Sequence, residues 1–376
     1  MVRLRESTSA CGFAFGVASV LLALLPWTSQ VRAQSAAQSA ASGAIRTPLG
    51  ETIYWSRFHD SGWKAMGKGW YDTAEREFTT AIRIAKRPEM GDSRVLARSY
   101  SSLAWALQKQ GRNAEAEPLA RWALETREAR FGANAEPVAR SLNQMATIYL
   151  ALGRFNQAEP LLRRVLAMNK VASTTIDRGR VVPLDASKST IMLQEQAQSE
   201  SLLGLGYVVQ RRFAEAEAEF ARAVALREAS QGSKHPETGD ELNNLAWARL
   251  EQGKLAEARP TMEKSLDILE QGRGVQDPSV ARALDGLARI DAGQNDLSAA
   301  ETKYLRLIAI YESLGTGQES RLNDGLKRYA DLLDRMGRSG EAGRVRDRLP
   351  RPRPAGEAKS GAPKPGAPAI PDRGRS

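Results

Sequence analysis

A regular repeat constrains the fold of this chain more than any other feature of its sequence. One alanine recurs in similar surroundings at seven places, Ala74, Ala116, Ala158, Ala216, Ala258, Ala300 and Ala342. The successive spacings are 42, 42, 58, 42, 42 and 42 residues. A second small residue lies twelve positions before each alanine, at Gly62, Ala104, Ala146, Gly204, Ala246, Ala288 and Ala330. A register kept over seven copies indicates a stack of similar structural units rather than one globular core.

Each unit has the pattern of two amphipathic helices joined by a tight turn. In the third unit, for example, apolar residues recur at helical intervals at Leu142, Met145 and Tyr149. A glycine usually separates the two helices, because it readily adopts the left-handed conformation that ends a helix. Arg211 and Asn295 take its place in two units. Since each helix pair can bury its apolar faces only against its neighbours, the sequence predicts a helical solenoid of about seven hairpins.

The unit resembles the tetratricopeptide repeat, in the long 42-residue variety of the kinesin light chain type. In the position numbers of that repeat, the first small residue is at position 8, the glycine at 15, the recurrent alanine at 20 and a large apolar residue at 24. The turn Gly232-Ser233-Lys234-His235-Pro236 also matches this variety. The resemblance covers residues 56–349 and implies an all-α, right-handed superhelical solenoid of about seven helix-turn-helix repeats. Arg346 stands at the last position 24 and predicts a polar end cap.

The first 33 residues (1–33) are typical of a signal peptide. Arg3 and Arg5 precede an apolar stretch from about residue 13 to 25, and Val31-Arg32-Ala33 suits cleavage before Gln34. An uncleaved anchor is the alternative, but the stretch is shorter than the roughly 20 residues that span a bilayer. Cys11 is the only cysteine, so the mature chain has none, which suits an oxidising compartment. We therefore expect a periplasmic or extracellular protein with no transmembrane segment after cleavage.

Three further segments lie outside the regular repeats. Residues 34–55 are expected to form a flexible leader. An insertion of 16 residues lies near 168–194, between the third and fourth repeats. We expect it to form a surface loop, or alternatively a lid that folds over the groove. Residues 350–376 are rich in proline, glycine and basic residues, which predicts a disordered tail that aids solubility or makes weak contacts with anionic surfaces.

The composition excludes several classes of function. The net charge is +10, of which the two ends carry +2 and +4, and the rest is too weak and scattered for a nucleic-acid groove. With one cysteine and two histidines, the chain lacks the ligands of a thiolate-zinc site. It also has no glycine-rich phosphate loop, metalloprotease motif or serine nucleophile elbow. We therefore expect no enzymatic activity, no catalytic residues, no metal and no cofactor.

The resemblance implies that the first helix of each repeat lines a concave groove, with positions 2, 5, 9 and 12 facing into it. The candidate partner-binding residues are Trp63, Arg98, Ser101, Trp105, Arg140, Asn143, Thr147, Asn243, Trp247, Arg282 and Arg289. The position-9 tryptophans offer a large contact area and an N–H donor, or alternatively pack between neighbouring helices. Family members use asparagine at position 5 to hold an extended peptide. The position-2 arginines either engage a carboxylate or pair with an acidic residue of the adjacent repeat.

These expectations favour a non-enzymatic scaffold or adaptor that holds a peptide or protein partner in its groove outside the cytoplasm. The alternative is a binder of anionic envelope polymer or glycan, through the position-2 arginines and the basic tail. Salt separates the two, because the affinity for a polymer should fall steeply with ionic strength and that for an indole-anchored peptide should not. The partner's identity and the oligomeric state do not follow from the sequence.

Overall fold

The structure is a computed structural model that describes residues 48–172, 174–177, 180–183, 186–315 and 317–350. Within these residues the chain forms fourteen helices and one two-stranded sheet. The expected signal peptide (1–33), residues 34–47 of the expected leader and the tail from residue 351 lie outside the described residues. The first helix begins at Pro48, so the boundary expected at residue 56 between leader and solenoid is wrong.

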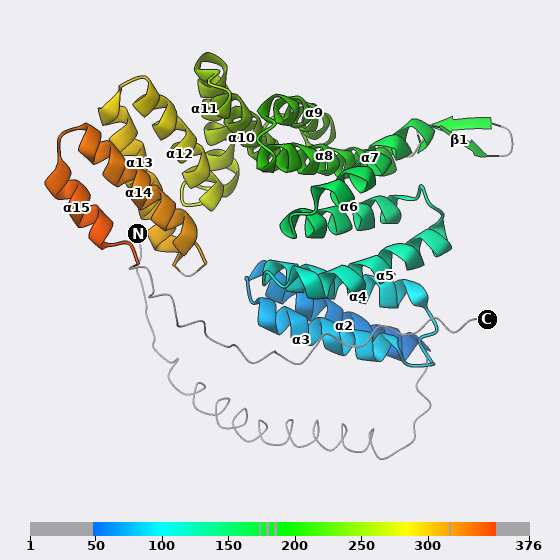
Figure 1. Ribbon diagram of the computed structural model, residues 1–376. Coiled ribbons are helices and arrows are strands. Elements are labelled where there is room, and N and C mark those ends of the chain that lie inside the picture. Colours follow the sequence, from blue (N-terminus) through cyan, green and yellow to red (C-terminus); the bar gives the residue numbers. More distant parts are fainter. Residues whose placement is uncertain (1–47, 173, 178–179, 184–185, 316, 351–376) are drawn as a thin grey trace, which may run out of the picture.

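The helices pair into seven hairpins that follow one another along an open arc (Figure 1). The pairs are α2 (Pro48–Gly67) with α3 (Tyr71–Ala85), α4 (Ser93–Lys109) with α5 (Asn113–Phe131), α6 (Glu136–Ala151) with α7 (Phe155–Ala172), α8 (Ala186–Val209) with α9 (Phe213–Gln231), α10 (Pro236–Glu251) with α11 (Leu255–Arg273), α12 (Pro278–Gly293) with α13 (Leu297–Leu314), and α14 (Glu319–Arg335) with α15 (Ser339–Asp347). This arrangement confirms the all-α solenoid of seven helix-turn-helix repeats.

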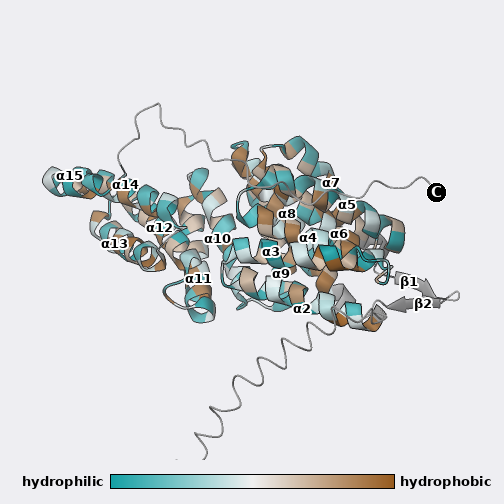
Figure 2. Cartoon of the chain, turned by 90° about the horizontal axis from the view of Figure 1, so that it is seen from below, coloured by the Kyte–Doolittle hydropathy of each residue, from teal (hydrophilic) through white to brown (hydrophobic). Residues whose placement is uncertain are grey.

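Small residues at position 8 allow the two helices of a hairpin to approach each other closely. A Cβ atom added at Gly62 would lie 2.4 Å from the Phe78 ring, and one added at Gly204 would lie 2.6 Å from the Phe220 ring. Both phenylalanines are at position 24 and are fully buried. Hydrophobic and hydrophilic residues alternate along the helices (Figure 2), as expected where amphipathic helices pack against their neighbours. A larger side chain at position 8 would therefore push the pair apart.

Two of the turns carry a side chain where the other repeats have glycine. Gly111 has a φ of 77°, which lies in the left-handed region. Arg211 and Asn295 adopt the same conformation, with φ of 61° and 67°. Asparagine tolerates this region, but arginine pays about 1 kcal/mol because its Cβ crowds the following carbonyl. The turn geometry is therefore kept in all seven repeats, at some conformational cost in the fourth.

The insertion between the third and fourth repeats contains a β-hairpin. Strand β1 (Thr174–Asp177) pairs antiparallel with β2 (Arg180–Pro183), with Thr174 opposite Pro183. The expectation of a loop without regular structure is wrong here, since β-branched residues such as Ile176 and Val181 favour extended backbone. The hairpin stands away from the helices in both views (Figures 1 and 2), so it does not form the alternative, a lid across the inner side of the arc.

The last helix, α15, closes the solenoid with charged residues. Arg346 lies 3.0 Å from Asp331 and 2.5 Å from Asp334, both on α14. These side chains are largely exposed, and the ion pairs take the place that a large apolar residue occupies in the earlier repeats. The polar end cap expected from Arg346 is confirmed.

Candidate functional site

The first helices lie on the inner side of the arc (Figure 1). Successive first helices contact one another from α4 to α6, α6 to α8, α8 to α10 and α10 to α12. All eleven candidate residues lie on these helices or on α2, the first helix of the first repeat. The inner surface of the first helices is therefore the candidate binding site.

The candidate residues differ widely in exposure. Trp63, Arg98 and Arg140 are exposed. Half-buried side chains are those of Trp105, Thr147, Trp247, Arg282 and Arg289. Ser101, Asn143 and Asn243 are buried, and Asn243 has no exposed surface. The expectation that the position-5 asparagines are exposed is therefore wrong.

The tryptophans of position 9 are neither free anchors nor simple core residues. Trp63 is 43% exposed and packs its ring edge against Phe78, with the ring centroids 5.8 Å apart. Trp247 is half-buried, and the guanidinium of Arg289 lies 4.7 Å from its ring centroid. The indole Nε1 of Trp247 is buried and has no hydrogen-bond partner. Among the described residues, Trp247 thus combines an apolar contact surface with a buried donor that has no partner.

Most polar side chains at position 5 bond to the neighbouring first helix, and Asn243 is the exception described below. We call these bonds the polar ladder. Its contacts are His59 Nε2 to Ser102 Oγ at 3.0 Å, Ser101 Oγ to Gln144 Oε1 at 2.6 Å, Ser199 Oγ to Asn143 Oδ1 at 2.6 Å, and Arg328 Nη1 to Asp285 Oδ2 at 2.8 Å. Ser201 also hydrogen-bonds the Glu241 carboxylate. Position 5 thus connects neighbouring repeats.

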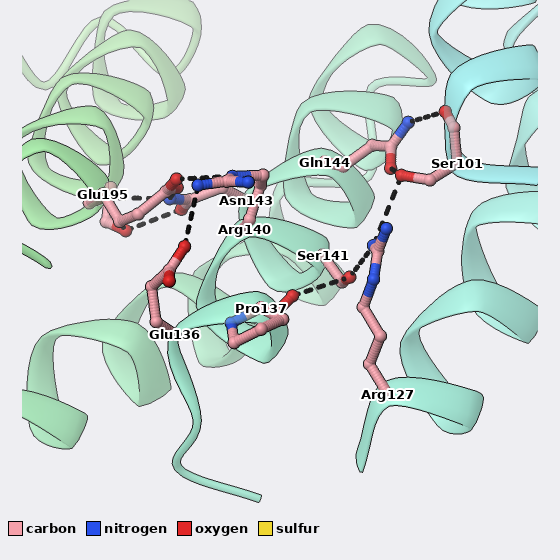
Figure 3. Close-up of polar contacts among 10 residues, drawn as sticks. Ser101, Arg127, Glu136, Pro137, Arg140, Ser141, Asn143, Gln144 and Glu195 are labelled. Atoms are coloured by element: carbon pink, nitrogen blue, oxygen red, sulfur yellow. Dashed lines mark hydrogen bonds and ion pairs between the residues drawn. The ribbon is translucent and has the colours of Figure 1, made fainter. Parts of the chain in front are cut away.

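Asn143 is fully engaged in this ladder (Figure 3). Its Nδ2 donates to the Glu195 carbonyl oxygen at 2.8 Å and to Glu195 Oε2 at 3.0 Å, while its Oδ1 accepts from Ser199. Arg140 donates to the same Glu195 and to Glu136. Asn143 and Arg140 therefore hold α6 against α8. Of the two roles expected for a position-2 arginine, Arg140 has the second, an ion pair with an acidic residue of the adjacent repeat.

The other two position-2 arginines have weaker partners. Arg98 places its guanidinium 5.7 Å from the Trp55 ring centroid. Arg282 lies 3.7 Å from Asp240 of the preceding first helix, and its buried Nε has no hydrogen-bond partner. Thr147, by contrast, donates to the backbone carbonyl of Asn143 at 2.7 Å, so its hydroxyl is satisfied within its own helix.

Asn243 interrupts the polar ladder. Both its Nδ2 and its Oδ1 are buried, and neither has a hydrogen-bond partner among the residues that the structure describes. The next first helix, α12, has Ala283 at position 3, where α8 supplies Ser199 to Asn143, and Gly286 at position 6, where α6 supplies Gln144 to Ser101. An amide left unpaired in this way costs about 1–3 kcal/mol. The unpaired amide makes this the most unusual polar group on the inner surface.

Further unpaired polar atoms and a cavity lie on the C-terminal side of Asn243. Besides Asn243 and Trp247, the Arg282 Nε and the Asp285 Oδ1 lack hydrogen-bond partners. A cavity of about 520 Å³ opens beyond them between α12, α13 and α14. Its lining residues are Arg289, Ala292, Gly293, Tyr304, Arg328, Asp331, Leu332 and Arg335. We call the inner surface of α10, α12 and α14 the C-terminal groove.

Two residues of the cavity could have been found from the sequence. Arg328 and Arg335 are seven residues apart, as are Arg321 and Arg328, and this spacing places all three on one face of a helix. Tyr304 stands at position 24, where the repeat pattern predicts a large core residue. Burial, and after it the charge of Asp285, raises the pKa of Tyr304 to about 12. The hydroxyl of Tyr304 therefore remains a donor at neutral pH.

A third missed residue, Arg127, comes from a second helix. It reaches from α5 to the inner surface and donates to Ser141 and Ser101 (Figure 3). The repeat pattern assigned only first-helix residues to the groove, so no sequence signal singled it out.

The described part of the chain shows neither a cluster of metal ligands nor a membrane-spanning helix. It contains no group of three or more histidine, cysteine, aspartate or glutamate side chains able to hold a metal ion. Each of its helices is too short or too polar to cross a bilayer.

Comparison with known families identifies the repeat. Sequence patterns described as tetratricopeptide repeat match residues 65–129, 195–271 and 250–313, and a second pattern of the same description matches residues 138–173. Together they cover more than half of the chain. No curated protein matches it.

Solved structures with a similar fold are numerous. The apo form of the quorum sensor NprR from B. thuringiensis has 16% identity and a TM-score of 0.60, covering 80% of this chain and 76% of that one. BtubC (BKLC) from P. vanneervenii has 19% identity and a TM-score of 0.51, covering 72% and 99%. A Rap protein complexed with competence and sporulation factor has 14% identity and a TM-score of 0.50, covering 81% and 74%. At these identities the likeness establishes the fold alone.

Proposed function

The chain belongs to the tetratricopeptide repeat family, and we propose that it is a non-enzymatic scaffold that binds an extended peptide segment of a partner in the C-terminal groove. The unpaired amide of Asn243 carries this proposal. A side-chain amide offers one donor and one acceptor, which is the complement of a backbone peptide group. A peptide in the groove would thus supply the contacts that Ser199 and Glu195 supply to Asn143.

The neighbours of Asn243 suit the same occupant. Trp247 lies four residues later on α10, hence on the same face, and offers its ring and its unpaired Nε1–H. The adjoining cavity of about 520 Å³ has room for a side chain of the peptide. Because the Asn243 amide is covered, binding includes a local rearrangement of side chains, which is common at interfaces.

The compartment is part of the proposal. The features of residues 1–33 support export to the periplasm or the outside of the cell, and the absence of cysteine beyond Cys11 is compatible with an oxidising environment. Mass spectrometry of the native protein tests this, because a mature chain that begins near Gln34 is expected. Retention of residues 1–33 would contradict it.

The binding proposal is tested by selecting a phage-displayed library of random peptides against the full chain. Affinities of the selected peptides are then measured by calorimetry for the wild type, Trp247→Ala, Asn243→Ala and the control Trp63→Ala. We expect the Trp247 variant to bind about 30-fold more weakly, corresponding to about 2 kcal/mol for an interface hot spot. Trp63→Ala should bind normally, since Trp63 lies in the first repeat, far from the C-terminal groove.

A thermal melt of each variant accompanies the binding assay. If Trp247 is chiefly a core residue, its removal lowers the melting temperature and leaves peptide affinity unchanged. Normal affinity in both the Trp247 and the Asn243 variant would reject the C-terminal groove. A steep loss of affinity with salt in the wild type would instead favour the anionic polymer alternative.

A further inference from the structure

The environment of Arg127 is unusual for a half-buried arginine. Its Nη1 donates to Ser101 Oγ at 3.3 Å and to Ser141 Oγ (Figure 3). Among the residues that the structure describes, no carboxylate pairs with its guanidinium. Burial, followed by the charges of Arg140 and Arg98, lowers the pKa of Arg127 to about 10. A charge taken out of water normally requires an opposite charge beside it, and the residues that the structure describes supply none here.

The equivalent arginine of the fourth repeat has a carboxylate beside it. Arg227 lies 100 residues after Arg127 in the same register, and its Nη1 is 2.6 Å from a carboxylate oxygen of Glu237. The charge of Arg227 also acts on the buried Glu241. Pro137 and Ser141 stand at the positions that correspond to these two glutamates. The guanidinium of Arg127 therefore faces neither of the two carboxylates that its equivalent faces.

The two serines beside Arg127 engage only one of its nitrogen atoms. Ser101 donates its hydroxyl hydrogen to Gln144, and Ser141 donates its own to the Pro137 carbonyl at 3.1 Å. Both hydroxyl oxygens thus act as acceptors for Nη1. In the described part of the chain, the Nε–H and Nη2–H groups of Arg127 make no hydrogen bond. These are the donors that a carboxylate engages in a bidentate pair.

The surroundings favour an anion. Arg98 is exposed nearby, and its guanidinium has an aromatic ring rather than a carboxylate as its partner. Arg140 also lies close, although Glu136 and Glu195 neutralise it. The local charge at Arg127 and Arg98 is therefore positive and uncompensated.

We infer that Arg127, backed by Ser101 and Ser141, is a carboxylate-binding site on the inner surface of the second and third repeats. The carboxylate belongs to an acidic side chain or to the C-terminus of a peptide that lies in the groove. The carboxylate-binding site does not depend on the proposed function, whereas the assignment of the carboxylate to a bound peptide rests on it. It lies apart from the C-terminal groove, so the two are testable separately.

The first test uses glutarate as the probe and needs no peptide. The melting temperature of the full chain is measured against increasing glutarate, with sodium chloride at matched ionic strength as the reference. A ligand that binds only the folded state raises the melting temperature in a saturable manner. We expect such a rise for the wild type, and an apparent affinity lowered about tenfold or more in Arg127→Gln, because the bidentate pair is lost.

Two further variants make the result specific. Ser141→Glu places a carboxylate at the position equivalent to Glu241, on which the charge of Arg227 acts. This carboxylate should therefore neutralise Arg127, raise the melting temperature without glutarate and abolish the response to glutarate. Arg76→Gln removes one exposed charge, which donates to Thr73 in the first repeat, and should respond as the wild type does. An equal response in wild type and Arg127→Gln, or a full response in Ser141→Glu, would overturn the site.

The source of the carboxylate is then found with the peptides that bind the full chain. Replacement of their acidic residues by amides, or amidation of their C-terminus, should weaken binding about tenfold in the wild type and have no effect in Ser141→Glu. If no peptide binds while glutarate still stabilises through Arg127, the proposed function fails and the site remains. If peptides bind with affinity unaffected by either change, their carboxylates do not use Arg127.

Discussion

The second and third repeats and the fourth and fifth repeats are two versions of one structure, offset by 100 residues. Asn143 corresponds to Asn243, and Arg127 corresponds to Arg227. In the earlier pair of repeats the asparagine is fully bonded and the arginine lacks a carboxylate. In the later pair the arginine has its carboxylate and the asparagine lacks every partner.

This exchange shows how a repeat fold produces different sites at equivalent positions. The fold requires only that the side chain at each inner position fits the space between neighbouring helices. Whether a polar side chain is available to a ligand depends on the residue that the next repeat places against it. The groups open to a ligand are therefore those that have lost their internal partner, whichever position number they share.

The largest expected effect concerns Asn143. Asn143→Ala should lower the free energy of unfolding by about 3 kcal/mol, since it removes three hydrogen bonds and takes the amide donor away from the buried Glu195 Oε2. Urea unfolding followed by circular dichroism measures this. Asn243→Ala is the matched control and should cost about 1 kcal/mol or less. Equal losses in both variants would contradict the contrast between the two asparagines.

A second difference between the versions is sensitive to pH. Tyr100 packs against Trp122 in the second repeat, with ring centroids 4.9 Å apart, whereas Glu200 occupies the equivalent of Tyr100. Burial, followed by a hydrogen bond to Glu219 and the charge of that residue, raises the pKa of Glu200 from 4.5 to about 7. The folded state therefore holds this proton more tightly than the unfolded state does.

The sign of the pH effect follows from this tighter binding. The stabilising contribution is fully present below pH 4.5 and is lost as the pH rises toward about 7. The loss is about 2 kcal/mol, because one unit of pKa difference is about 1.4 kcal/mol and part of it is screened. Urea unfolding at pH 5 and pH 8 measures it, and Glu200→Gln should remove the difference. A variant with unchanged pH dependence would show that another group is responsible.

A smaller effect is expected at the turn of the fourth repeat. Gly111 of the second repeat corresponds to Arg211, and both have a positive φ. Arg211→Gly should stabilise the chain by about 1 kcal/mol, because glycine adopts this conformation without strain, although its unfolded state is more flexible. The measurement is the urea midpoint. A destabilised variant would mean that the arginine side chain makes a contribution larger than the strain.

The sequence predicted the fold well because the fold depends on residue size. Gly62 against Phe78, repeated at constant spacing, is enough to specify a helical hairpin and its stacking. The sequence predicted the location of the candidate binding site less well. Asn143 is bonded to Glu195 on the far side of the insertion, and Arg127 enters the inner surface from a second helix. Such contacts depend on pairs of residues in different repeats, which a pattern within one repeat does not contain.

The last prediction, with the smallest expected effect on stability, concerns Ala283, because it stands where Ser199 stands in the earlier version. Ala283→Ser places a hydroxyl at position 3 of α12. From the same position in α8, Ser199 donates to the position-5 amide of Asn143 in α6. If Asn243 lacks a partner only because this serine is missing, the variant should gain about 0.5–1 kcal/mol in stability, the net value of one hydrogen bond.

The same variant separates a structural explanation of Asn243 from a binding one. In the Ala283→Ser variant the Oδ1 of Asn243 accepts from the new hydroxyl, so the amide is less available to a peptide. Peptide affinity should therefore fall while stability rises. Ala281→Ser is the control, since it adds a hydroxyl at a buried position of the same helix two residues away. Increased stability with unchanged peptide affinity would mean that Asn243 is an uncompensated core residue and that the groove binds through Trp247 and the cavity alone.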